Sequence, residues 1–139
     1  MKKMLAVLLV VVGVQVVAQA AQAQSLRHYE NRFVLMLDMA VRYNDYMRQR
    51  LEDRRLCAYA QLMTQANARE AEQMTPPPKY EMMHPHFLLV LKNIERSFYF
   101  AAEGRMQQYR NHQNIARREL RILEELAQRA GVSIWLFRD

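Results

Sequence analysis

Residues 25–51, SLRHYENRFVLMLDMAVRYNDYMRQRL, decide the fold of this chain. They contain no proline or glycine, and their apolar side chains recur at steps of three and four. That spacing places the side chains on one face of an α-helix and excludes the strict alternation of a strand. We expect Ser25 to be the N-cap. The stripe comprises Leu26, Tyr29, Phe33, Leu37, Ala40, Tyr43 and Met47, and continues with Leu51, Ala58, Leu62 and Ala66.

A proline-rich linker separates this stripe from a second one. Thr75-Pro76-Pro77-Pro78 cannot continue a helix, because proline lacks a backbone N–H and clashes with the preceding turn. Pro85 suits the first position of the next helix, and Gly131 suits the position just beyond its end. The second stripe comprises Leu88, Leu91, Ile94, Phe98, Ala101, Tyr109, Ala116, Leu120, Leu123 and Ala127.

The two stripes predict an all-α fold. Unbroken, each helical arm would measure roughly 70 Å at 1.5 Å per residue, much longer than the usual globular helix of about 11–12 residues. We expect breaks at residues 52–55, where charge interrupts the stripe, and at Gly104. Two breaks give an up-down-up-down four-helix bundle. The alternative is a long antiparallel helical hairpin that dimerises to complete its core.

The first 23 residues have the layout of a secretory signal peptide. Lys2 and Lys3 precede the apolar run from residue 5 to 17, and small-x-small cleavage motifs end at Ala20 and Ala23. The run of about 13 residues is shorter than the roughly 20 needed to span a bilayer. We therefore expect cleavage, export to the periplasm or beyond, and a mature protein that is not integral to the membrane.

Residues 24–139 are expected to form one domain. Its parts are a first helical arm at 24–74, the linker at 75–84, a second arm at 85–130 and an apolar tail at 131–139. The tail contains Trp135 and is expected to fold back over one end of the core. Cys57 is the only cysteine, so no internal disulfide can form, and we expect its side chain to be a small buried hydrophobe.

The charge balance bears on the partners. Removing Lys2 and Lys3 from the 20 basic residues leaves 18 against 14 acidic ones, a formal charge of +4. Export argues against nucleic acid, so a periplasmic protein or an anionic envelope surface is the expected partner. Arg110, Arg117 and Arg121 share one helical face, with Arg118 beside them. These four arginines are the candidate interaction face.

Met82, Met83, His84 and His86 form the densest group of candidate metal ligands. Thioethers suit copper(I) and imidazoles suit copper(II) or zinc, although a closed site needs three or four convergent ligands. Enzyme signatures are missing: the chain has no glycine-rich phosphate loop, nucleophile elbow or His-Glu-x-x-His motif. We therefore expect no enzymatic activity.

Two segments carry a family resemblance. The linker Thr75-Pro76-Pro77-Pro78-Lys79 and the turn Ala101-Ala102-Glu103-Gly104 resemble the corresponding parts of the periplasmic cytochrome b562 family, whose fold is an up-down four-helix bundle. The resemblance implies a bound haem b with Met39 as an axial ligand. The family's axial histidine aligns with Glu124.

Two functional hypotheses follow from the sequence. The first is an exported periplasmic helical-bundle protein with a non-enzymatic binding or interaction role and no cofactor, alone or as a homodimer. The alternative is a carrier of haem b or of a metal such as copper, similar to cytochrome b562.

Overall fold

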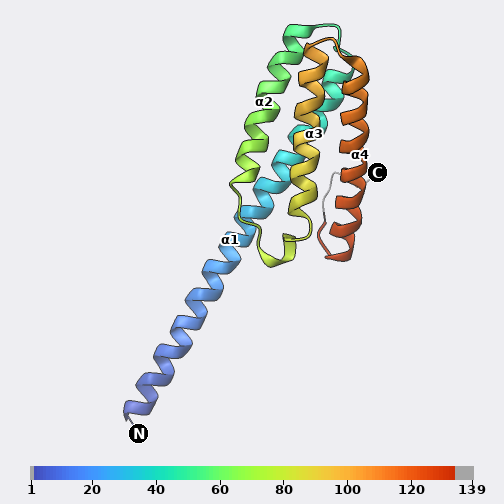
Figure 1. The fold of residues 1–139 in the computed structure, drawn as a ribbon. Helices are drawn as coiled ribbons and strands as arrows, with labels where there is room; N and C mark the ends of the chain where they lie inside the picture. Colours follow the sequence, from blue (N-terminus) through green and yellow to red (C-terminus); the bar gives the residue numbers. More distant parts are fainter. Residues whose placement is uncertain (1, 134–139) are drawn as a thin grey trace.

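The computed structural model describes residues 2–133, and the side chains of residues 24–133. Its four helices are α1 (Lys2–Arg48), α2 (Arg54–Glu72), α3 (His84–Ala102) and α4 (Met106–Arg129), with a short 3₁₀ turn, η1 (Pro78–Tyr80), before α3. The helices run alternately up and down, and the N-terminal part of α1 extends beyond the bundle (Figure 1). The predicted four-helix bundle is confirmed. The apolar tail beyond residue 133, with Trp135, lies outside the described residues.

Both predicted helix breaks are confirmed. Asp53 caps α2, since its Oδ1 accepts a hydrogen bond from the Leu56 N–H at 2.9 Å. Gly104 turns the chain between α3 and α4 with a φ of +73°, a conformation that other residues adopt only with strain. The guanidinium of Arg54 packs over Gly104, where a Cβ would lie 2.7 Å from Nη2. A side chain at position 104 would therefore also displace the Arg54 guanidinium.

The predicted N-cap at Ser25 is wrong. Helix α1 passes through Ser25 without interruption, because residues 14–24 contain neither proline nor glycine to stop it. Pro85 occupies the second position of α3, which begins at His84. Gly131 ends α4 as predicted, with a φ of +63°.

The core-facing side of α2 differs from the predicted stripe. Ala58, Leu62 and Ala66 are exposed. The buried side chains of α2 are instead Cys57, Ala60, Thr64, Ala68 and Ala71. These small residues let α2 lie close against α3, since the side chains at a helix contact set the interaxial distance. The larger side chains of α2 are therefore left on its outer face.

Helix α1 packs at a greater distance from its neighbours than α2 and α4 do from α3. Bulky side chains hold it there, including the buried Tyr29 and Phe33. The Phe33 ring centroid lies 4.5 Å from that of Phe87, and the Tyr29 centroid lies 4.9 Å from that of Tyr80. Because backbone contact is sparse, grooves remain along α1.

The sequence did not predict that Asn44 and Gln113 are neighbours in the core. The side-chain amides of Asn44 on α1 and Gln113 on α4 pair inside the core, and Gln113 Nε2 also donates to Ser97 Oγ on α3 at 2.8 Å.

Cys57 is fully buried, as predicted, and its Sγ lies 3.8 Å from the Leu51 carbonyl oxygen. Burial raises the pKa of the Cys57 thiol. Within residues 24–133, no helix has the length and apolar character needed to cross a membrane.

Candidate functional site

The outer sides of α1 and α2 enclose an apolar groove of about 450 Å³. We call it the α1–α2 groove and define it by Met39, Tyr43 and Tyr46 of α1 together with Tyr59 and Met63 of α2. It forms because α1 stands away from α2 while α2 turns only small side chains inward. Its volume falls within the range of about 300–1,000 Å³ typical of ligand sites.

Large apolar side chains surround this groove. Tyr46 and Tyr59 are each more than half exposed, and Met39 and Met63 are 45% and 43% exposed. Leu62, which precedes Met63 on α2, is 59% exposed, although leucine usually lies inside. Single exposed leucines are ordinary, whereas a contiguous apolar group marks an interaction surface.

Charged side chains of α1 and α2 lie at the groove and beyond it. Asp38 Oδ1 and Arg42 Nε lie 2.5 Å apart, and Arg32 pairs with Glu70 across the two helices. The Arg50 guanidinium lies 3.8 Å from the centre of the Tyr46 ring.

Tyr43 is the groove tyrosine whose hydroxyl is most affected by its surroundings. Burial raises the pKa of Tyr43, and the neighbouring Tyr59 and Tyr46 raise it further. The groove therefore presents aromatic rings, thioethers and hydroxyls, together with the Asp38–Arg42 ion pair.

The four candidate metal ligands point to different partners. Tyr29 Oη and His84 Nδ1 are 2.8 Å apart in the core, whereas His86 Nδ1 lies 2.7 Å from Glu119 Oε2 on α4. Met83 is buried, but Met82 is 73% exposed. Burial lowers the pKa of His84. Among residues 24–133, no three His, Cys, Asp or Glu side chains are grouped to hold a metal ion.

The candidate arginine face lies along the outer side of α4. Arg110, Arg117, Arg118 and Arg121 are all exposed. Arg118 Nε lies 3.6 Å from Glu119 Oε1. For the other three, no carboxylate of the described part of the chain forms an ion pair. The face therefore presents guanidinium groups that are available to an external anion.

The groove supplies one of the two axial donors that the cytochrome resemblance implies. Met39 lines it, but no histidine of residues 24–133 does. Glu124, at the aligned histidine position, is half-buried on α4. His112 is engaged elsewhere, with its Nδ1 at 2.9 Å from Asn93 Oδ1 and its ring stacked on Phe100. These residues do not fit a haem held by methionine and histidine.

Sequence reasoning placed Met39 near a ligand but did not identify the rest of the groove. Tyr46, Tyr59 and Met63 lie off the apolar stripes. The available signal was the spacing of Tyr59, Leu62 and Met63, which gathers three large apolar side chains on one face of α2, separate from the small side chains that are buried. Comparison of the chain with family models, curated proteins and solved structures finds no match.

Proposed function

We propose that this is an exported, non-enzymatic binding protein whose α1–α2 groove receives apolar side chains of a protein partner. The proposal rests on one observation: exposed leucine, methionine and tyrosine side chains line and border this groove. Tyrosine and methionine are enriched at protein interfaces. Methionine also adapts its shape to different apolar partners.

A protein suits this surface better than a small enclosed ligand. The apolar side chains continue past the groove onto Leu62 of α2, so a partner limited to the groove would leave Leu62 in water. Tyr46 and Tyr59 stand on facing helices, where each can cover an inserted side chain with a rigid ring. Such aromatic side chains supply much of the binding free energy in interfaces.

Export is the second part of the proposal. Leu26 is the first described side chain of α1 to pack against the core, three residues after the second cleavage motif. Loss of residues 1–23 would therefore remove none of the described packing. Intact-mass measurement of protein taken from the periplasm tests this, and a mass that still includes residues 1–17 would contradict it.

Dye binding tests the groove directly. We expect the folded mature protein to bind 1-anilinonaphthalene-8-sulfonate saturably, and Met63→Asp to reduce the bound fluorescence several-fold. Leu89→Asp is the matched control, because Leu89 on α3 is 41% exposed, close to the 43% of Met63. Equal effects of the two substitutions, with helicity retained, would contradict the assignment of the groove.

The arginine face supports a second candidate function, docking on an anionic envelope surface. Arg110, Arg117 and Arg121 carry unpaired charge within the described chain. Attraction of this kind is screened by salt. We expect co-sedimentation with vesicles of anionic phospholipid at low salt, and its loss in the Arg110→Glu/Arg117→Glu/Arg121→Glu variant.

A charge-matched control separates this face from net charge. Arg27, Arg55 and Arg69 are also exposed but lie on α1 and α2. Reversal of these three should leave vesicle binding largely intact. If both triple variants lose binding equally, only overall charge matters and the α4 face has no special role.

A further inference from the structure

A second groove lies farther toward the N-terminus of α1, beside η1 and the residues that follow α4. It measures about 640 Å³, and we call it the α1–α4 groove. Its walls are Val34 and Leu35 of α1, Tyr80 of η1, and Val132 and Ser133 after α4. It shares only Asp38 with the α1–α2 groove.

This groove exists because α1 and α4 do not close against each other along this part of the bundle. Their described hydrogen bonds are those of the Asn44–Gln113 pair, farther along α1. Nearer the η1 end, Val34 is only half-buried and Leu35 is 58% exposed. Part of the apolar surface of these two side chains is therefore exposed.

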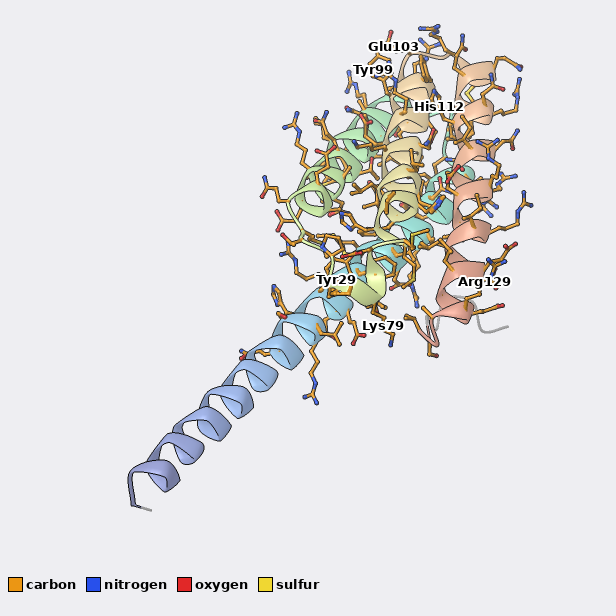
Figure 2. All side chains as sticks on the ribbon, turned by 60° about the horizontal axis from the view of Figure 1, so that its bottom comes forward. Tyr29, Lys79, Tyr99, Glu103, His112 and Arg129 are labelled. Atoms are coloured by element: carbon orange, nitrogen blue, oxygen red, sulfur yellow. The ribbon has the colours of Figure 1, made fainter. Side chains whose placement is uncertain are left out.

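The chain leaves α4 in the direction of this groove. Gly131 adopts a φ of +63°, and the Val132 N–H donates to the Ala127 carbonyl at 2.8 Å. This left-handed turn ends the helix and reverses the chain. Val132 then packs against the core. Lys79 of η1 and Arg129 of α4 lie at the same end of the bundle (Figure 2).

We infer that the α1–α4 groove is the docking site of the segment that follows, residues 134–137, Ile-Trp-Leu-Phe. The lengths agree. Four extended residues span about 13 Å, and the wall of α1 from Glu30 to Asp38 spans about 12 Å at 1.5 Å per residue. All four side chains are apolar, as are the exposed parts of Val34 and Leu35.

The polar groups of the groove suit the same segment. A buried indole N–H needs an acceptor, and Glu30 and Asn31 line the wall of α1. Arg138, the next residue, is basic, and Asp38 lies at the far end of that wall. The segment would cover the open side of the α1–α4 seam and leave the α1–α2 groove free.

The single tryptophan makes this measurable in the full mature protein. We expect Trp135 of the folded protein to emit at shorter wavelength than in the urea-unfolded chain, and iodide to quench it several-fold less. Leu35→Asp should shift the emission toward that of the unfolded chain and restore quenching. Leu62→Asp should do neither, because Leu62 is equally exposed, at 59%, but lies on α2 away from this groove.

Three results would overturn the inference. The first is a wild-type tryptophan as quenchable as that of the unfolded chain while the helices remain folded. The second is a protected tryptophan whose emission Leu35→Asp leaves unchanged. The third is protection that increases with protein concentration, which would place the segment on a second copy of the chain.

Discussion

The side-chain amides of Asn44 on α1 and Gln113 on α4 hydrogen-bond each other in both directions, at 3.0 and 2.6 Å, inside the core. Each amide supplies one donor and one acceptor to the other, so the pair forms only when the two helices stand at one axial position. Ser97 accepts the second N–H of Gln113 and thereby includes α3. This network fixes the height of α1 relative to the rest of the bundle, where backbone contact does not.

Loss of one partner should be costly. Asn44→Ala leaves the Gln113 amide without its reciprocal bonds in a buried place, and we expect it to lower the free energy of unfolding by about 1–3 kcal/mol. Replacement of both by leucine should be nearly neutral, since no polar group is then left unpaired. Urea denaturation measures both. A double variant that loses the sum of the two single losses would contradict this account.

Neighbouring aromatic residues on α3 provide a test of the core. Phe98 is fully buried, whereas Tyr99 is 39% exposed. We expect Phe98→Ala to lower the free energy of unfolding by about 3–5 kcal/mol. Tyr99→Ala should cost much less, because it leaves no closed cavity. Similar losses from the two substitutions would mean that the packing of α3 is misassigned.

Stability should fall in mild acid. Burial lowers the pKa of His84 and of His112 below the ordinary value of about 6.5, which applies to the unfolded chain. Below that pH the unfolded chain binds more protons than the folded one, so the free energy of unfolding decreases as pH falls. The contribution of these imidazoles is complete above about pH 6.5 and is lost through the window below it.

A single substitution isolates the His84 part. His84→Gln keeps a group that can bond Tyr29 Oη but does not titrate. We expect the difference in urea midpoint between about pH 7.5 and about pH 5.5 to shrink in this variant. His112→Gln serves as the comparison, and a pH dependence unchanged in both variants would contradict the role of these two residues.

The exposed arginines of α4 should be dispensable for folding. Reversal of Arg110, Arg117 and Arg121 to glutamate removes no ion pair of the described chain, and surface changes usually alter stability by roughly 0.5 kcal/mol or less. We expect the melting temperature to move by only a few degrees. A variant that fails to fold would show that these side chains support the structure.

Helical spacing predicts the class of fold and most of the core on α1, α3 and α4, because those helices bury large residues at regular steps. Asp53 and Gly104 mark both breaks, since each satisfies a specific need of the backbone at a helix end. Such signals depend on local sequence and can therefore be recognised in it. The prediction at Ser25 is wrong because a capping side chain does not start a new helix where the preceding residues already continue one.

Helical spacing does not predict which face of α2 is buried. Leu62 outranks Ala60 in hydrophobicity, yet Ala60 is buried and Leu62 is exposed. Close approach to α3 favours small side chains, and that requirement comes from the partner helix rather than from α2. Likewise, the reciprocal bonding of Asn44 with Gln113 depends on two positions that are 69 residues apart.

The burial of Cys57 has a consequence for the reactivity of the folded protein. A fully enclosed thiol with a raised pKa is a poor nucleophile, so the folded chain protects Cys57 from oxidants and from exchange with other thiols. Any reagent that modifies this sulfur must wait until α2 separates from the bundle. The rate at which Cys57 is alkylated therefore measures how often α2 separates from the folded bundle.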